Sequence, residues 1–336
     1  FVDSSIRTIP AIDEENYFFK FSSFQKPLLD FYAKNPDFVI PDFRFNEIRS
    51  FVERGLEDFS ISRLKSKMPW GVDVPNDPDH VMYVWFDALT SYISTLGWGT
   101  DDKDFDFWKE GAPVQYCGKD NLRQQSAMWQ AMLMAAGLPN SKHIIIDGFI
   151  TSGGQKMSKS VGNVISPFDV IDTFKDVTEY PEEVLRFVLL HEISSFEDGD
   201  ITMDSIKTAY TAYLQNGIGN LTNRIMKMAT TAQTVADFTQ TVAEMDTHLE
   251  QFDVKKSLEN LMTKVAMLDK KIQVEEPFKV IKIDEEKGKK IIKELLNELL
   301  CIARELAFCM PKTSAKILEC IRENKMPEKP LFNRLA

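Results

Sequence analysis

Apolar residues recur every three or four positions in several stretches of the chain, which is the spacing of one helix face. The pattern predicts helices over 15–32 and 43–56. It returns strongly from about Ser205, where an apolar and a polar stripe share one helical wheel. The apolar stripe comprises Tyr210, Leu214, Ile218, Leu221, Ile225 and Met228. A later stripe comprises Ile291, Ile292, Leu295, Leu296, Leu299 and Leu300. The second half is therefore predicted to be a helix bundle.

A different pattern occupies the middle of the chain, where short β-branched and aromatic runs alternate with helical segments. Strands are predicted at 81–86, 116–118 and 143–146, and helices over 87–95 and 122–136. Strands that alternate with helices form a parallel sheet covered on both faces. The predicted fold class is therefore α/β plus all-α.

Composition and charge narrow the possible functions. The chain has 336 residues, of which 43% are hydrophobic and 27% charged, so it is expected to be ordered and to contain two or three domains. A formal net charge of -11 argues against a histone-like binder. Any contact with nucleic acid must therefore come from local groups.

The cysteines and the apolar runs point to an ordinary protein of a reducing compartment. Cys117, Cys301, Cys309 and Cys320 have neither CxxC spacing nor partnering histidines, so no zinc or other metal site is predicted and they are interpreted as buried thiols. No apolar run reaches the length of a membrane span, so no membrane association is expected. The chain begins Phe1-Val2-Asp3 without an initiator methionine, and it is interpreted as a piece of a longer protein.

The most informative local run is a glycine-hinged loop, 153–160, with the sequence GGQKMSKS. It carries Lys156 and Lys159, three positions apart. Two mobile ammonium groups can stabilise charge on the β- and γ-phosphates of a triphosphate while the α-phosphate is attacked. A solvated basic turn is the alternative for an isolated pair at this spacing. The whole pentapeptide KMSKS after a strand favours the nucleotide interpretation.

This pentapeptide resembles the signature loop of class I aminoacyl-tRNA synthetases, and the surrounding chain resembles the methionyl-tRNA synthetase family. The blocks that carry the resemblance are EENYFF at 14–19, GLEDFSISR at 55–63, YVWFDA at 83–88 continuing to Tyr92, and GKD at 118–120. The block at 83–88 separates the chain from the leucyl, isoleucyl and valyl enzymes. The resemblance implies the second half of a Rossmann-type parallel sheet, followed by an α-helical anticodon-binding bundle.

The resemblance also implies a domain order. Residues 1–60 would be the end of the connecting insertion with a helical return, and 61–165 the second half of the catalytic domain. Residues 166–205 would form the stem-contact linking region, and 206–336 the anticodon-binding domain.

The implied activity is that of a cytoplasmic methionine-tRNA ligase. It would use ATP, with Mg²⁺ bound to this substrate, to activate methionine, and would then transfer the methionyl group to tRNA(Met). The family's His-x-Gly-His motif is absent from this sequence. The chain alone is therefore expected to be inactive.

The resemblance assigns a thioether pocket to Trp85, Ala88 and Tyr92. Trp85 is predicted to end a strand, and Ala88 and Tyr92 to lie four apart on the next helix. Aromatic rings make favourable contacts with sulfur, and a small alanine leaves room for the ligand. The alternative is an aromatic cluster of the core.

Three further residues are expected to line the amino-acid site. By resemblance, Arg63 would pair with the carboxylate or phosphate of the substrate, and a surface arginine is the alternative. Asn121 and Gln125 stand where the family has an apolar residue and a histidine. The pocket is therefore expected to be more polar than is usual.

The nucleotide site is expected where a strand ends and a helix begins, at Gly118 and Asp120. Gly118 permits close approach of the nucleotide, and by resemblance Asp120 accepts hydrogen bonds from the ribose hydroxyls. The family's usual His-Gly is Asp147-Gly148 here. The adenine is therefore expected to contact backbone near Ile150, and Lys159 would complete the ATP site.

The polar stripe of the bundle carries Asn216, Asn220, Asn223 and Arg224, whose amide and guanidinium groups can read bases by hydrogen bonding. The resemblance assigns the CAU anticodon to this helix, with contacts at Asn220 and at Arg224, which departs from the family in residue type. Phe278 follows a proline where the family has a stacking tryptophan, and its ring can still stack on a base. A core phenylalanine is the alternative.

Two other functions stay open. The missing first motif and the changes at Asn121, Gln125 and Asp147 also fit a non-catalytic tRNA- or RNA-binding protein derived from a synthetase. A related enzyme for another aliphatic amino acid is the weaker third option. The oligomeric state is left open.

Overall fold

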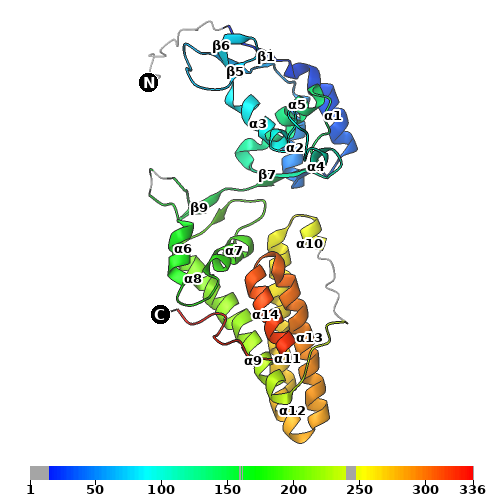
Figure 1. Ribbon diagram of the computed structural model, residues 1–336, viewed down its shortest axis with the longest axis vertical. Helices are drawn as coiled ribbons and strands as arrows, with labels where there is room; N and C mark the ends of the chain where they lie inside the picture. The colour runs from blue at the N-terminus through cyan, green and yellow to red at the C-terminus, as the bar shows by residue number, and fades with distance from the viewer. Residues whose placement is uncertain (1–14, 159, 161, 240–246, 336) are drawn as a thin grey trace, which may run out of the picture. The chain divides into compact units, whose positions relative to one another are not determined.

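The computed structural model describes residues 15–158, 160, 162–239 and 247–335. The chain divides into two compact units between Asp147 and Gly148 (Figure 1). Lys156 belongs to the second unit by its contacts. The domain boundaries predicted at residues 60, 165 and 205 stay predictions.

The first unit contains a three-stranded parallel sheet in the order β2-β8-β7. Its strands are β2 (Val39–Ile40), β8 (His143–Asp147) and β7 (Val114–Gly118). Ile144, Ile145 and Ile146 are fully buried in β8, an apolar run typical of a covered parallel strand. The predicted strands at 116–118 and 143–146, and the α/β class of this part, are confirmed.

Helices and two small antiparallel sheets make up the rest of the described first unit. One core joins Leu28, Ile48 and Ala131 of three helices to Ile144 and Ile146 of β8. The helices are α1 (Gln25–Lys34), α2 (Asp42–Glu53), α3 (Val84–Ser94), α4 (Asp106–Lys109) and α5 (Trp129–Ala135). The antiparallel strands are β1 (Phe18–Phe19) with β3 (Phe59–Ser60), and β4 (Ser62–Leu64) with β6 (Asp77–Met82) and β5 (Asp73–Val74).

The start of the helix predicted over 15–32 is wrong. Phe18 and Phe19 pair with β3 as a strand, and α1 begins only at Gln25. The rings of Phe19 and Phe21 pack on Phe59, at centroid distances of 5.6 and 5.4 Å. A short aromatic run fits either type of element, and partners distant in sequence decided the outcome here.

The strand predicted over 81–86 is also wrong in its second half. β6 ends at Met82, and the amides of Phe86 and Asp87 donate to the Tyr83 carbonyl oxygen at 3.0 and 3.2 Å. These bonds begin α3, so Trp85 lies in a helix and does not end a strand. Propensity for β structure is overridden because α3 buries Leu89 and Ile93 in an apolar cluster.

The second unit begins with a small sheet in the order β10-β9-β11. Its strands are β9 (Ile150–Ser152), β10 (Gln155–Lys156) and β11 (Gly199–Asp200). Helix α6 (Pro167–Phe174) follows, and the Ser166 hydroxyl accepts from the Phe168 amide at 3.2 Å. Pro167 occupies the first turn, where its missing N–H leaves no helical hydrogen bond unmade.

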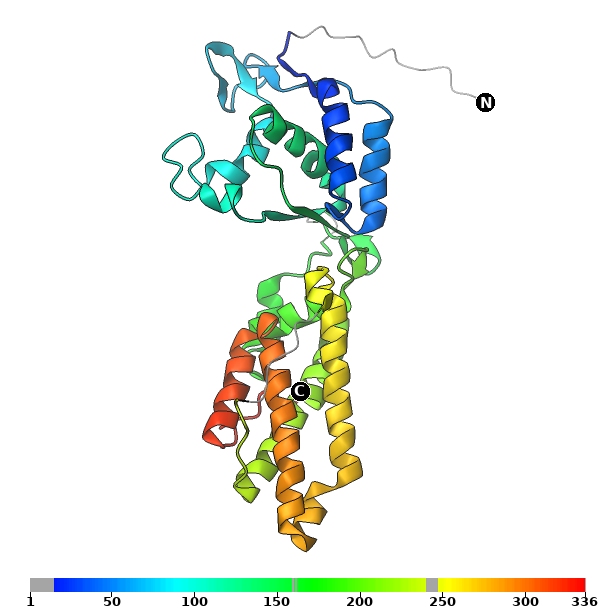
Figure 2. The same cartoon turned by 90° about the vertical axis from the view of Figure 1, so that its right-hand side faces the viewer.

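The rest of the second unit is a helix bundle with one continuous core. Figures 1 and 2 show its long helices side by side, and α13 contacts α9, α11, α12 and α14. Its helices are α7 (Pro181–Glu192), α8 (Met203–Ala209), α9 (Asn220–Ala232), α10 (Thr247–Glu250), α11 (Val254–Glu275), α12 (Pro277–Ile283), α13 (Glu285–Glu305) and α14 (Pro311–Glu323).

The apolar stripes that predicted this bundle are confirmed. Tyr210, Leu214 and Ile218 are buried, and so are Leu295 and Leu299. One difference is that Tyr210–Gly219 forms a π-helix, η4, which leads directly into α9. Among the described residues, no helix combines the length and apolarity needed to cross a bilayer.

Candidate functional site

The loop with Lys156 is built on a tight hairpin between β9 and β10. Gly153 and Gly154 have φ values of 62° and 74°, and two successive positive φ angles are what a two-residue type I′ turn requires. Because residues with a Cβ rarely adopt this backbone, the glycine pair determines the hairpin locally. The turn sends the chain back beside β9, with Lys156 paired to Thr151.

Two side chains outside the pentapeptide hold this loop. The Asp200 carboxylate accepts from the Gly154 amide at 2.8 Å and from the Thr151 hydroxyl at 2.7 Å, and these bonds lower its pKa. Asn163 accepts from the Ser158 amide at 2.9 Å and donates to the Lys156 carbonyl at 3.3 Å. Sequence reasoning missed both, since no local pattern links Asp200 to a turn 46 residues earlier.

Lys156 itself is exposed, and its ammonium lies 4.2 Å from the centroid of the Phe149 ring. A cation above an aromatic face is held weakly and can leave for a more negative partner. Lys159, the second predicted lysine, lies outside the described residues. The hairpin therefore presents Lys156 to solvent on a positioned stem.

A cavity of about 530 Å³ lies in the first unit and contains two of the predicted residues, Arg63 and Trp85. Five of its thirteen lining residues are aromatic, and the lining also contains the carboxylates Glu57 and Asp58 and a second arginine, Arg123, that sequence reasoning missed. The aromatic lining comprises Phe21, Phe51, Phe59, Tyr83 and Trp85. Such a wall suits a flexible apolar ligand that carries a charged group.

Both arginines of this cavity contact neighbouring groups, Arg63 through hydrogen bonds and Arg123 through an aromatic ring. Arg63 Nη1 donates to the Ser60 hydroxyl at 2.7 Å and to the Ser62 carbonyl at 2.6 Å, and its guanidinium lies 4.8 Å from the Tyr83 ring centroid. The guanidinium of Arg123 lies 4.5 Å from the Phe51 ring centroid. The alternative of a freely solvated arginine therefore does not describe Arg63.

Three of the predicted pocket residues share one face of α3. Trp85, Ala88 and Tyr92 stand three and four positions apart in this helix. Trp85 lines the cavity, whereas Ala88 is exposed and is not part of its wall. Tyr92 instead accepts a hydrogen bond from the Gln125 side-chain amide at 2.9 Å.

Gln125 lies in a π-helical turn, η3 (Gln124–Met128), and only 4% of its surface is exposed. Asn121 is half-buried at the end of a 3₁₀ turn, η2 (Lys119–Asn121). The structure thus joins Gln125 to Tyr92, although neither residue lines the cavity at Arg63 and Trp85.

The predicted nucleotide residues of the first unit follow the carboxyl end of β7. Gly118 pairs with Asp147, the last residue of β8, and Asp120 is exposed in the next turn. Burial raises the pKa of Asp147 to about 6. Burial, followed by the nearby Asp147 charge, raises the pKa of the Cys117 thiol to about 12. Ile150 is 41% exposed in β9 of the second unit.

The predicted anticodon residues lie on α9 and α12. Asn220 is exposed at the start of α9, and Arg224 forms a part-buried ion pair with Asp269 of α11. Asp269 also accepts from the Gln273 side chain at 2.8 Å. Phe278 is 44% exposed, so the alternative of a core phenylalanine is excluded.

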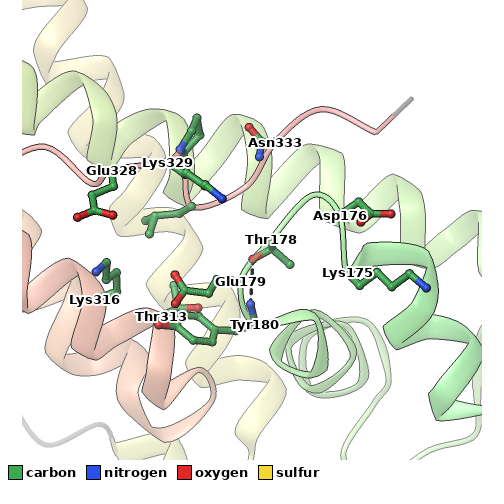
Figure 3. A pocket seen from close by; sticks show the side chains of 12 residues that line it. Lys175, Asp176, Thr178, Glu179, Tyr180, Thr313, Lys316, Glu328, Lys329 and Asn333 are labelled. Atoms are coloured by element: carbon green, nitrogen blue, oxygen red, sulfur yellow. Dashed lines mark hydrogen bonds between the residues drawn. The ribbon is translucent and has the colours of Figure 1, made fainter.

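Figure 3 shows a separate cavity of about 420 Å³ in the second unit. Thr178 and Tyr180 precede α7 there, Thr313 and Lys316 belong to α14, and Lys329 comes from the C-terminal segment. The Tyr180 amide donates to the Thr178 hydroxyl at 3.4 Å. The lining mixes lysines and carboxylates, and none of the predicted site residues belongs to it.

No group of three or more histidine, cysteine or acidic side chains suited to a metal ion occurs within the described ranges. All four cysteines are free thiols. Cys309 and Cys320 are buried as interpreted, whereas Cys117 and Cys301 are only half-buried.

Two family models match the chain. The model described as "tRNA synthetases class I (M)" matches residues 4–226. The model described as "Anticodon binding domain of methionyl tRNA ligase" matches residues 226–330. The two matches meet in α9, the helix that carries Asn220 and Arg224.

Similar proteins have the same description. A methionine–tRNA ligase of Helicobacter pylori J99 is 37% identical over 96% of this chain and 51% of its own length. One of Thermosynechococcus vestitus is 44% identical over 66% of this chain and 41% of its own length. The chain spans about half the length of these relatives.

A solved structure agrees with the sequence relatives. It is Mycobacterium tuberculosis methionyl-tRNA synthetase in complex with methionyl-adenylate, which matches with a TM-score of 0.84 and 29% identity. The match covers 96% of this chain and 69% of that one.

Proposed function

Since the chain belongs to the methionyl-tRNA synthetase family of class I, we propose that its protein is a methionine-tRNA ligase of the cytoplasm. It would condense methionine with ATP, release pyrophosphate, and transfer the methionyl group to the terminal adenosine of tRNA(Met). The observation that carries this proposal is the Gly-Gly hairpin, which presents Lys156 on a stem held by Asp200 and Asn163.

The lysine loop would act by positioning charge. Lys156 and Lys159 would approach the β- and γ-phosphates and stabilise the negative charge that develops as pyrophosphate leaves. Gly118, Asp120 and Ile150 would hold the nucleoside, and Mg²⁺ would arrive bound to ATP. The weak contact of Lys156 with Phe149 supports a loop that can exchange partners when ATP binds.

The amino-acid site would use the aromatic and polar groups of the first unit. Arg63 and Trp85 line one cavity, and the fixed Arg63 guanidinium suits a carboxylate or phosphate. Tyr92 with Gln125 would contact the amino acid, and Ala88 and Asn121 would complete its surroundings.

The bundle would read the anticodon. Asn220 and Phe278 are exposed, so an amide and an aromatic ring are available to unpaired bases. Arg224 is oriented by Asp269, and a base could share or replace that partner.

Methionine-dependent ATP–pyrophosphate exchange by the native full-length protein tests the catalytic proposal. Lys159→Ala should lower exchange by orders of magnitude, about 100-fold or more, because transition-state charge loses its partner. Lys290→Ala, at an exposed position of α13, is the matched control and should leave exchange unchanged. Equal activity of the two variants would contradict the role of the loop.

Aminoacylation and exchange, measured on the same full-length protein, distinguish a loss of anticodon recognition from misfolding. Asn220→Ala should weaken aminoacylation of tRNA(Met) and leave exchange intact. Loss of both activities would indicate a folding defect. Binding of tRNA by an unchanged protein that shows no exchange would instead favour a non-catalytic RNA-binding protein.

A further inference from the structure

A buried chain of hydrogen-bonded side chains ends on Tyr92 in the first unit. Its members are 0–6% exposed and do not change charge at ordinary pH. Three of them have no role in the proposals above. The chain comprises Gln130, Ser141, Gln115 and Gln125.

The direction of this chain is set by backbone groups. The Ser141 amide donates to Gln130 Oε1 at 3.1 Å, and Gln130 Nε2 donates to the Gln125 carbonyl oxygen at 3.0 Å. A backbone N–H can only donate and a carbonyl can only accept. The Gln130 amide is therefore held in one orientation from both of its ends.

The orientation passes along the side chains one bond at a time. Gln130 Nε2 also donates to the Ser141 hydroxyl at 3.1 Å, which in turn donates to Gln115 Oε1 at 2.6 Å. The shorter distance is typical of an O–H···O bond. Gln115 Nε2 then donates to Gln125 Oε1 at 3.3 Å, and Gln125 Nε2 to the Tyr92 hydroxyl at 2.9 Å.

The Tyr92 oxygen is therefore an acceptor toward Gln125, and its own proton points to another partner. An amide chain also keeps this polarity when the pH changes. An imidazole in the place of Gln125 would gain a second N–H on protonation, which would oppose the N–H of Gln115.

We propose that Gln130, Ser141 and Gln115 are positioning residues that keep the Tyr92 hydroxyl proton available to the side chain of the bound amino acid. This inference rests on the proposed function, which places Tyr92 at the methionine site. A thioether sulfur is a weak hydrogen-bond acceptor, whereas the methylene group of norleucine accepts no hydrogen bond. The chain would thus favour methionine over its closest isostere.

Gln115 offers two variants of similar size that separate polarity from packing. In Gln115→Glu, an ionised carboxylate still accepts from Ser141 but has no proton for Gln125. The Gln125 amide would turn to donate to it, and Gln125 Oε1 would take the Tyr92 proton. In Gln115→Met, the link is lost without a new charge.

The test is the kcat/KM for methionine and for norleucine in ATP–pyrophosphate exchange, measured between pH 5 and 8 on the native full-length protein. At pH 8, Gln115→Glu should lose about tenfold with methionine, the worth of one hydrogen bond, and change little with norleucine. Burial raises the pKa of such a carboxyl. Activity with methionine should therefore recover as the pH falls, because the protonated Glu donates to Gln125 as the amide did.

The Gln115→Met variant should lose the methionine preference at every pH without recovery, and it carries the test if Gln115→Glu does not fold. Thermal unfolding of each variant monitors folding. Equal losses for the two amino acids, or a loss in Gln115→Glu that ignores pH, would overturn the inference. If the protein without any substitution showed no methionine-dependent exchange, that result would instead overturn the proposed function.

Discussion

The two candidate catalytic regions are held in opposite ways. In the first unit, Arg63, Gln125 and Tyr92 are positioned by half-buried hydrogen bonds. In the second unit, Lys156 is exposed on a hairpin that depends on two glycines and the side chains of Asp200 and Asn163. A rigid pocket suits recognition of a small ligand, whereas a lightly held loop suits a cation that must follow moving phosphate charge.

The largest effect should come from breaking the buried chain. Gln130→Leu keeps the volume but leaves the Ser141 amide and the Gln125 carbonyl without their partner, so the free energy of unfolding of the first unit should fall by about 3 kcal/mol. All 5 tryptophans of the chain lie between Trp70 and Trp129, so their fluorescence during denaturation reports on this unit. A loss below about 1 kcal/mol would show that water satisfies these groups.

The opposite result is expected for the hairpin. Asp200→Ala should lower the turnover number for ATP–pyrophosphate exchange about tenfold, because a loop with fewer anchors spends less time in its working position. The unfolding midpoint should not change, since this carboxylate is exposed. Asp200→Asn is the matched control, because its side-chain oxygen can still accept from Gly154 and Thr151, and it should retain most activity. Destabilisation equal to that of Gln130→Leu would end the distinction between the two regions.

A smaller effect on the stability of the first unit is expected when a change of pH ionises Asp147. Burial raises its folded-state pKa to about 6, so its contribution to stability is full below the unfolded value of 3.8 and is lost as the pH rises through about 6. Asp147→Asn should therefore stabilise the first unit by about 1 kcal/mol at pH 7, allowing for partial exposure, and by nothing near pH 4. Thermal unfolding of both proteins across this range is the measurement. A constant difference would mean that Asp147 does not titrate in this window.

The last and smallest combined effect is expected for Phe278 of α12. Phe278→Ala removes a ring that is 44% exposed, so the free energy of unfolding should change by less than about 1 kcal/mol. Aminoacylation of tRNA(Met) should nevertheless fall about fivefold through the loss of stacking on a base. Phe278→Tyr is the control and should keep the activity. Normal aminoacylation of tRNA(Met) by Phe278→Ala would exclude Phe278 from the anticodon site.

Helices with long apolar stripes were predicted well, and short aromatic runs were not. The stripe from Ile291 to Leu300 defines one face of α13, which leaves little room for another element. At 18–19 and 83–86, helix and strand patterns are equally satisfied over a few residues. Contacts with Phe59 and Ile61, which are distant in sequence, determined which element forms at each place.

The sequence by itself determined the family resemblance, the parallel strands at 116–118 and 143–146, the bundle and the glycine-hinged loop, because each depends on neighbouring residues or on a long repeated pattern. The strand predicted from residue 81 instead pairs antiparallel with β4 and β5. Only the tertiary structure decided that Asp200 anchors the hairpin, that Arg123 joins the aromatic cavity and that Gln115 is linked to Tyr92 through Gln125. These contacts join residues with no periodic relation along the chain. Their hydrogen bonds depend on distances of a few ångströms that folding alone establishes.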